Sequence, residues 1–348
     1  MGDDVENVMN GPDHRLSVAP MMDWTDRHER FFLRQITSRT LLYTEMITTG
    51  AILHGDRDQL LGYHACEHPL ALQVGGSDVQ ALAQCTEIAK DLGYDEINLN
   101  VGCPSDRVQS GRFGACLMAE PTHVGECVAA MAGSGLPVTV KCRIGIDGRE
   151  SFDDFLEFVT AVRCGGVGSL AVHARIAVLN GLSAKQNREI PPLRYDDVYR
   201  LKEEMPELEV VINGGIKDLP ETKVHFAHVD GVMIGRAAYQ NPWMLAVADQ
   251  SIFGEEGAGP SPDEVLERIA EYADEHLRAG GRLAEVTRHI LGLFQGVPGA
   301  RAWRRHLSEN APKPGAGLEV LRQAAALVPA EIRAGQVEFG EVITDVSG

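Results

Sequence analysis

The stretch PVTVKCRIGIDGRESFDDFLEFVTAVRCGGVGSLAVHA, residues 137–174, decides the fold. Two nearly continuous aliphatic runs, residues 137–143 and 169–174, flank a segment whose apolar residues lie three and four positions apart. Such runs are typical of strands buried on both faces of a parallel sheet, and the segment between them is typical of an amphipathic helix that ends in glycine. The stretch therefore predicts a strand, a helix and a second, parallel strand.

The same pattern recurs along the chain. Eight such runs alternate with helix-length segments: RLSVAP (15–20), LLYTEM (41–46), LALQVGG (70–76), EINLNVG (96–102), PVTVKCR (137–143), SLAVHA (169–174), EVVINGG (209–215) and DGVMIGR (230–236). Eight alternating strand and helix units predict an α/β protein with a (β/α)8 TIM barrel.

The strand pattern stops at a connector rich in glycine and proline, GEEGAGPSP (254–262), and the rest of the chain has helical spacing. We expect a disordered N-terminal tail at 1–14, a catalytic barrel at 15–250, a small C-terminal helical bundle at 261–328 and a C-terminal tail at 329–348.

Composition limits the classes of function. No window has the 18 or more uncharged apolar residues of a membrane span, and the acidic N-terminus lacks the features of a signal peptide, so we expect a cytoplasmic protein that meets no membrane. The seven cysteines include no CxxC pair and no histidine at zinc-ligand spacing, which predicts neither a disulfide framework nor a metal site. Nothing in the sequence indicates an obligate protein partner.

The net charge of −18 opposes binding to a polyanion unless basic groups gather in one place. They do so in residues 281–307, which hold five arginines and two histidines against one glutamate. A basic helical face of this kind can follow a phosphate backbone, although a solvated helix face remains the alternative for any single arginine.

Residues suited to chemistry lie at the ends of the predicted strands, where a barrel builds its active site. Each is ordinary alone, because a single Met is usually core and a single Gln or Lys is usually solvated, but their recurrence at five strand ends favours one site. They are Ala19, Pro20, Met21, Gln73, Asn100, Cys103, Lys141 and His173.

The last two strands end in glycine. Asn213, Gly214 and Gly215 end the seventh run, and Gly235 and Arg236 end the eighth. Glycines allow backbone N–H groups to approach an anion, and barrels often hold a phosphate between these two loops. The alternative is a glycine that caps a strand and an arginine in a surface ion pair.

Six segments resemble the motifs of the tRNA-dihydrouridine synthase family, in matching order and spacing from residue 15 to about 310, and the likeness is nearest to the type that acts at positions 20 and 20a. They are APMMDWTD (19–26), NLNVGCPSDRVQSGRFGACLM (98–118), VKCRIGID (140–147), NREIPPL (187–193), VINGGI (211–216) and MIGRAAYQNPW (233–243).

The resemblance implies an enzyme that carries FMN, takes electrons from NADPH and reduces the 5,6 double bond of uridine in the D-loop of tRNA. It implies that Cys103 is the catalytic acid, next to Asn100, which neighbours the target nucleotide. The implied flavin contacts are Ala19 to Met21, Gln73 at the pyrimidine edge, Lys141, His173, and, at the phosphate, Asn213 to Gly215 with Gly235 and Arg236. The implied tRNA contacts are Lys185, Arg188, Arg301 and Arg304.

General chemistry supports the acid role. Hydride addition to carbon 6 of uracil leaves an enolate whose carbon 5 must receive a proton from the opposite face. An ordinary thiol, with a pKa of about 8.5, is mostly protonated near pH 7 and can donate that proton.

One loop departs from the family pattern HARKAWLKG. This chain reads HARIAVLNG, with Ile176, Val178 and Asn180 in place of two lysines and a tryptophan. The change lowers the positive potential beside the target base, so the affinity for tRNA is expected to differ.

Two other functions remain open from the residues alone. One is a flavin barrel that acts on a free pyrimidine, which would need no arginine-rich helical surface. The other is a tRNA-binding folding factor without chemistry, which would not depend on Cys103.

Overall fold

A closed parallel sheet forms the core of one of two compact units in the computed structural model, which describes residues 11–336. This unit comprises Met1–Asp23 and Thr40–Gly235. Its strands are β1 (Leu16–Val18), β2 (Leu42–Tyr43), β3 (Ile47–Thr48), β4 (Leu70–Gly75), β5 (Glu96–Val101), β6 (Val138–Arg143), β7 (Ser169–His173), β8 (Glu209–Asn213) and β9 (Gly231–Ile234). All neighbours pair in parallel in the order β1-β9-β8-β7-β6-β5-β4-β2, and β3 also pairs with β4.

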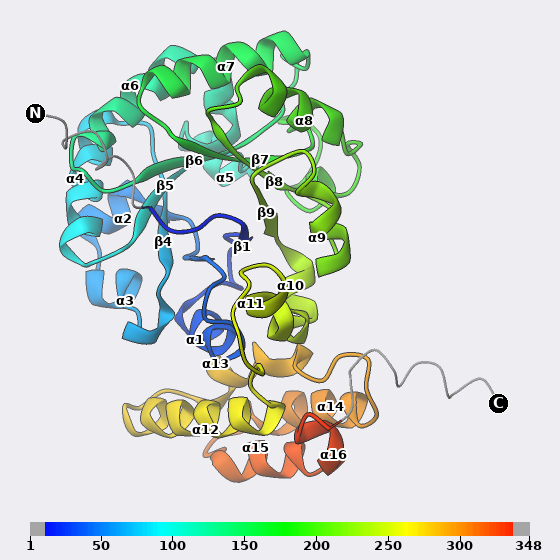
Figure 1. Cartoon of the computed structure of the whole chain (residues 1–348). Coiled ribbons are helices and arrows are strands. Elements are labelled where there is room, and N and C mark those ends of the chain that lie inside the picture. Colours follow the sequence, from blue (N-terminus) through cyan, green and yellow to red (C-terminus); the bar gives the residue numbers. More distant parts are fainter. Residues whose placement is uncertain (1–10, 337–348) are drawn as a thin grey trace, which may run out of the picture. The chain divides into compact units, whose positions relative to one another are not determined.

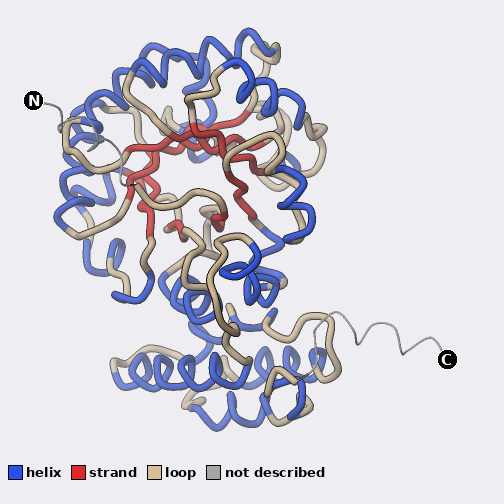
Figure 2. The backbone as a smooth tube through the Cα atoms, in the orientation of Figure 1, coloured by secondary structure: helices blue, strands red, loops and turns tan. Residues whose placement is uncertain are grey.

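The sheet closes between β1 and the segment that leads into β2. Ser17 forms a parallel bridge with Leu41, and the N–H of Val18 donates to the carbonyl of Leu41 at 2.9 Å. Figure 2 shows the strands in red inside the helices of this unit. The predicted (β/α)8 barrel is confirmed.

The second predicted strand is divided into β2 and β3. Between them, the hydroxyl of Thr44 accepts a hydrogen bond of 3.0 Å from the N–H of Gln73 on β4. Because a side chain here replaces a main-chain acceptor, the ladder is interrupted at residues 44–46, which the apolar pattern did not predict.

The helices of this unit and its short 3₁₀ segments follow the strands (Figure 1). They are α2 (Thr49–His54), α3 (Arg57–Leu61), η1 (Ala65–Glu67), α4 (Val79–Asp91), α5 (Asp106–Ser110), η2 (Gly114–Ala119), α6 (Pro121–Ala132), α7 (Phe152–Cys164), η3 (Gln186–Arg188), α8 (Tyr195–Glu204) and α9 (Leu219–His225). The start of α7 is fixed by a capping box in which Ser151 and Asp154 bond each other's backbone N–H.

The barrel interior is packed by apolar side chains and, at its N-terminal end, by a buried polar cluster. The apolar cluster is Ala19, Leu41, Tyr43, Ala71, Ala171, Val211 and Met233. In the polar cluster, Glu96 is fully buried, and its two oxygens lie 2.5 Å from Nε2 of His14 and 2.9 Å from the hydroxyl of Tyr43. Burial alone would lower the pKa of His14, but the ion pair with Glu96 and a hydrogen bond to Glu209 raise it to about 10.

The second compact unit comprises Trp24–Arg39 and Arg236–Gly348. Its helical segments are α1 (Arg27–Ile36), α10 (Arg236–Gln240), η4 (Pro242–Val247), α11 (Ala248–Ser251), α12 (Pro262–Arg278), α13 (Leu283–Thr287), η5 (Ile290–Gly292), α14 (Ala300–Asn310), α15 (Leu318–Ala325) and α16 (Ala330–Arg333). The predicted helical segment after the barrel is confirmed.

Two details of this helical unit differ from the sequence pattern. Helix α1 lies between two barrel strands in sequence but is bound within this unit, since Asp26 at its start contacts Arg288 and His289. The helical spacing of residues 284–296 does not give one helix. A side chain at Gly292 would lie 2.7 Å from the carbonyl oxygen of Gln240, so two backbones meet closely here and the chain bends through η5.

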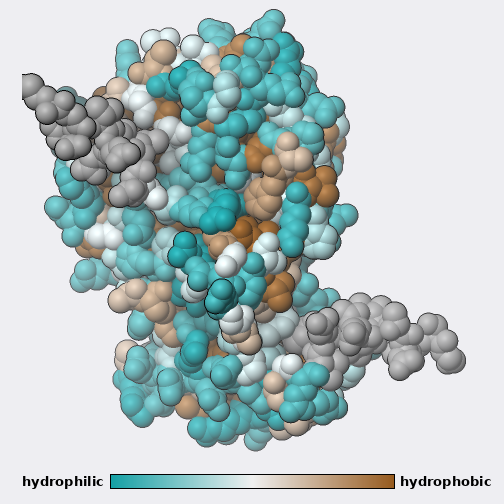
Figure 3. Space-filling model, in the orientation of Figure 1, coloured by the Kyte–Doolittle hydropathy of each residue, from teal (hydrophilic) through white to brown (hydrophobic). Residues whose placement is uncertain are grey.

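The predicted domain limits, 15–250 and 261–328, remain a prediction. Of the predicted tails, residues 1–10 and 337–348 lie outside the described residues, whereas His14 is buried and α16 is helical. No helix between residues 11 and 336 is long and apolar enough to cross a membrane. Hydrophilic residues cover most of the face that Figure 3 shows, and apolar residues are scattered over it.

Candidate active site

The parallel strands bring the predicted active-site residues to one end of the barrel. Asn100 on β5 is in register with Lys141 on β6, and His173 on β7 is in register with Asn213 on β8. Gln73 on β4 is in register with Asn98, two residues before Asn100. These residues therefore surround the carboxyl ends of the strands, which we call the barrel mouth.

The first and last strands of the barrel end at the same mouth. Ala19, Pro20 and Met21 follow β1, and Gly235 follows β9, its partner strand. A side chain at Gly235 would lie 3.8 Å from Cβ of Ala19 and 3.9 Å from Sδ of Met21. Glycine therefore leaves the space beside these residues open.

Cys103 is held at the mouth by the residue three positions before it. Its N–H donates a hydrogen bond of 3.0 Å to Oδ1 of Asn100, and Nδ2 of Asn100 donates one of 2.9 Å to Oε1 of Gln73. The Cys103 side chain is half-buried, with Sγ 3.5 Å from the hydroxyl of Ser105. The thiol is thus fixed in a loop that remains partly open.

The same chain of hydrogen bonds continues down the barrel interior. Nε2 of Gln73 donates to Oδ1 of Asn98 at 2.8 Å, and Nδ2 of Asn98 donates to the hydroxyl of Thr139 at 2.8 Å. That hydroxyl donates in turn to Oε1 of Glu96 at 2.5 Å. We call this series from Cys103 to Glu96 the amide relay.

Arg143 ties the Cys103 loop to the loop after β7. Its guanidinium donates to the carbonyls of Gly102, Ile176 and Asn187, each at 3.0 Å. Burial lowers the pKa of Arg143 only to about 10, so the group stays charged at neutral pH. One buried cation therefore sets the spacing of two active-site loops.

Lys141 and His173 at the mouth differ in charge at neutral pH. Burial and the neighbouring Arg143 lower the pKa of Lys141 to about 8, so its ammonium is still mostly protonated at pH 7, with Nζ 3.1 Å from Oδ1 of Asn213. Burial together with Arg143 and Lys141 holds the pKa of His173 well below its usual range, so this imidazole is neutral.

Several groups at the mouth fit an anionic flavin such as FMN. Nδ1 of His173 is buried and has no hydrogen-bond partner among the described residues. The N–H groups of Gly215 and Ile216 also have no hydrogen-bond acceptor among residues 11–336. A buried polar group normally has a partner, and an anion would provide one for consecutive N–H groups.

The predicted tRNA contacts of the barrel lie on the loop after β7. Lys185 and Arg188 are exposed, on either side of Asn187, which is fully buried and bonds the backbone of Val178 through both its amide atoms. The carbonyl of Ile176 accepts a hydrogen bond from Arg143. Hydrogen bonds therefore hold the backbone at Ile176 and Val178, two of the positions at which this loop departs from the family pattern.

Fewer basic residues of the stretch 281–307 are available to bind an anion than the sequence indicates. Arg282 pairs with Glu285 and Arg288 pairs with Asp26, which His289 also contacts, so both arginines are neutralised within the unit. The remaining basic residues of the stretch lie on α14: Arg301, Arg304, Arg305 and His306.

Helix α14 separates its two faces clearly. Trp303 and Leu307 are buried, whereas Arg301 and Arg305 are exposed one turn apart, and Arg304 bonds Gln295. Arg236 begins α10 in this same unit. The sequence prediction named Arg301 and Arg304 and did not name Arg305, which is exposed four residues after Arg301 on the same helix.

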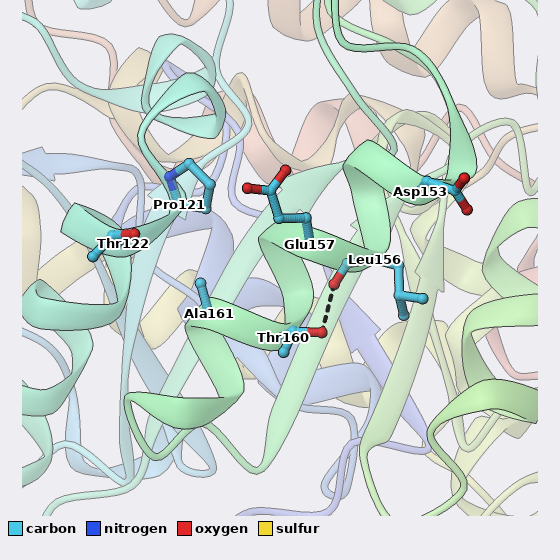
Figure 4. Close-up of a pocket in the computed structure, with 7 residues that line it drawn as sticks. All are labelled: Pro121, Thr122, Asp153, Leu156, Glu157, Thr160 and Ala161. Atoms are coloured by element: carbon cyan, nitrogen blue, oxygen red, sulfur yellow. Dashed lines mark hydrogen bonds between the residues drawn. The ribbon is translucent and has the colours of Figure 1, made fainter.

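An open groove on the outside of the barrel takes no part in this site. It lies between two helices, and Figure 4 shows the residues that line it: Pro121 and Thr122 of α6, and Asp153, Leu156, Glu157, Thr160 and Ala161 of α7. None of the predicted site residues lines it.

The fold and the mouth define a (β/α)8-barrel protein with a fixed thiol, a half-buried ammonium and an open glycine turn at the carboxyl ends of its strands. The model of the dihydrouridine synthase (Dus) family matches residues 17–328, and the chain belongs to this family.

Relatives match almost the whole chain. A tRNA-dihydrouridine(20/20a) synthase of Vibrio parahaemolyticus is 58% identical over 320 residues, which make up 91% of this chain and 98% of that protein. The protein of the same name in Escherichia coli strain K12 is 56% identical over 316 residues, 90% of this chain and 91% of that protein. The one in Synechocystis is 57% identical over 310 residues, 89% of this chain and 93% of that protein.

Proposed function

We propose that this chain reduces the 5,6 double bond of uridine at positions 20 and 20a in the D-loop of tRNA, with FMN as cofactor and NADPH as electron donor. The observation that carries the proposal is the fixed, half-buried thiol of Cys103 at the mouth of a barrel whose half-buried ammonium, Lys141, and glycine turn fit an anionic flavin. Relatives that bear the name of this activity match nine-tenths of the chain.

The residues at the mouth are assigned to the cofactor by what they can donate. The N–H groups after Asn213, with Gly235 and Arg236, would hold the phosphate, and Ala19 to Met21 would line the ring. Gln73, Lys141 and His173 would contact its polar edge. When bound and reduced, FMN supplies a hydride to carbon 6 of the base.

Cys103 completes the reduction. Its S–H bond breaks as a C–H bond forms at carbon 5, so hydride and proton together saturate the double bond. The thiolate that remains regains a proton from water, which the half-buried position of Cys103 allows. Asn100 keeps this loop in place through the N–H of Cys103.

The RNA must be held while one base leaves its stack. Extruding a base costs a few kcal/mol, which contacts to neighbouring phosphates can offset. We assign these contacts to Lys185 and Arg188 on the barrel and to Arg301 and Arg304 on α14. A tRNA substrate would place the enzyme in the cytoplasm.

Oxidation of the reduced flavoprotein by defined RNAs tests the proposal. Transfer RNA from cells that lack this gene should oxidise the bound flavin rapidly and gain dihydrouridine at positions 20 and 20a, whereas fully modified tRNA should not. Oxidation by free uracil but not by tRNA would indicate an enzyme of free pyrimidines. No oxidation by either, despite RNA binding, would indicate a folding factor.

A further inference from the structure

The turn after β8 exposes backbone and no side chain. Gly214 has a φ of +116° and Gly215 one of +79°, a region that favours glycine. A side chain at Gly214 would lie 3.2 Å from Nε2 of His173, and one at Gly215 would lie 2.6 Å from Leu193. Both glycines are therefore needed for the backbone to pass between these neighbours.

One side chain fixes the orientation of this turn. The hydroxyl of Tyr195, at the start of α8, donates a hydrogen bond of 2.7 Å to the carbonyl of Gly214. In a trans peptide the carbonyl and the following N–H point in opposite directions. Because Tyr195 holds the Gly214 carbonyl on its own side, the N–H of Gly215 must point to the other side.

The Tyr195 side chain is itself held in place. Its ring meets that of His225 edge to face, with centroids 4.8 Å apart. Burial raises the pKa of Tyr195 to about 12, so the hydroxyl remains a donor at neutral pH. The nearby carboxylate of Glu221 accepts the N–H of Lys217 at 2.9 Å.

We propose that Tyr195 is a positioning residue that aims the Gly214–Gly215 peptide at a phosphate monoester, and so gives the site its preference for FMN over riboflavin. This inference rests on the flavin assignment of the proposed function. It concerns the phosphate alone, because no hydrogen bond or ring contact among the described residues joins Tyr195 to Gln73, Lys141 or His173, the residues assigned to the ring.

The apoprotein is titrated with FMN and with riboflavin, and binding is measured by the quenching of flavin fluorescence. Comparing the two affinities separates the contribution of the phosphate to binding from that of the ring. Tyr195→Phe keeps the aromatic ring and removes the hydroxyl. We expect the affinity for FMN to fall about 5- to 10-fold, the effect of one hydrogen bond, and the affinity for riboflavin to stay the same. The FMN preference of the wild type should shrink by that factor.

Tyr199→Phe is the matched control. Tyr199 lies one turn further along α8, and its hydroxyl bonds Nδ1 of His225 at 2.8 Å instead of the turn. This variant should bind both flavins as the wild type does, and thermal unfolding of both apoproteins checks that they fold.

Three outcomes would overturn the inference. Equal losses of FMN and riboflavin affinity in Tyr195→Phe would show a general packing role. Unchanged FMN affinity would show that the turn keeps its orientation without the hydroxyl. A folded wild-type apoprotein that binds neither flavin would remove the cofactor assignment and this role together, whereas the first two outcomes leave the proposed function intact.

Discussion

Asn100 and Cys103 are joined by a hydrogen bond of 3.0 Å from the N–H of Cys103 to Oδ1 of Asn100, and this contact is the upper end of the amide relay. An amide side chain can usually be turned over, because its two ends are nearly the same size. Here the relay ends at Glu96, whose carboxylate only accepts. Each donor in the series must therefore point toward the bottom of the barrel.

Glu96→Gln should allow the hydrogen bonds of the amide relay to run in either direction, because a glutamine can donate as well as accept. We expect the rate of dihydrouridine formation to fall about 10-fold or more, on the scale of one misdirected hydrogen bond, as Asn100 and Gln73 sample reversed orientations. Single-turnover oxidation of the reduced flavoprotein by tRNA measures this rate.

The control for that variant is Glu209→Gln. Glu209 shares His14 with Glu96 but has no contact with the amide relay. Both variants should lose stability through His14. Equal rates for the two variants would show that the relay does not act on the mouth.

Cys103→Ala should lower the rate of dihydrouridine formation by about 10² to 10⁴, the usual contribution of a positioned general acid. Binding of flavin and of tRNA should persist, since neither needs the S–H group. Mass spectrometry of the product tRNA measures the reaction, and filter binding measures the complex.

Cys116→Ala is the matched control for that experiment. Cys116 follows Cys103 in the same region, but its thiol donates to the carbonyl of Phe113 at 3.1 Å. We expect this variant to keep its activity. If Cys103→Ala were as active as Cys116→Ala, another group would have to supply the proton.

Lys141→Met should make the bound flavin harder to reduce. An ammonium at the mouth favours the anionic reduced form, and its removal should lower the midpoint potential by about 30 to 60 mV, one to two factors of ten for a two-electron couple. Spectroelectrochemical titration at pH 7 tests this. A potential equal to that of the wild type would mean that Lys141 does not act on the flavin.

The barrel could be predicted from the sequence because its strands are apolar on both faces and separate amphipathic helices. The break between β2 and β3 could not, since it depends on the hydroxyl of Thr44 and a partner on another strand. The bend at Gly292 likewise depends on a close approach to residue 240, which no local periodicity records.

The mouth residues could be predicted because they stand where the apolar runs end, whereas the residues that hold them could not. Asn98 lies in the middle of β5 and Arg143 ends β6, and the sequence does not indicate the partners of either. Tyr195 begins a helix, and its partner Gly214 is 19 positions away. The basic stretch was too broad because Arg282 and Arg288 have acidic partners that only the fold brings close.

Arg301, assigned above to tRNA, and Arg305, which is exposed one turn further along α14, should each contribute one phosphate contact. Replacing either by alanine should weaken tRNA binding and lower the slope of log K against log salt by about 1. Arg282→Ala, which removes a cation already paired with Glu285, should leave the slope unchanged. Equal slopes for all three variants would exclude α14 from the RNA interface.

His14 should make the stability of the protein fall at alkaline pH. Its pKa is raised to about 10 by Glu96 and Glu209 against the opposing effect of burial, and is about 6.5 in an unfolded chain. A raised pKa means that the stabilisation is complete below pH 6.5 and is lost as the pH rises through 10, with an upper limit on the order of 4 kcal/mol. Urea unfolding at pH 6, 8 and 10 should show this decrease for the wild type and for His54→Gln, a variant of an exposed histidine, and a much flatter profile for His14→Gln. Parallel profiles for the wild type and His14→Gln would show that the charge on His14 is not what Glu96 and Glu209 stabilise.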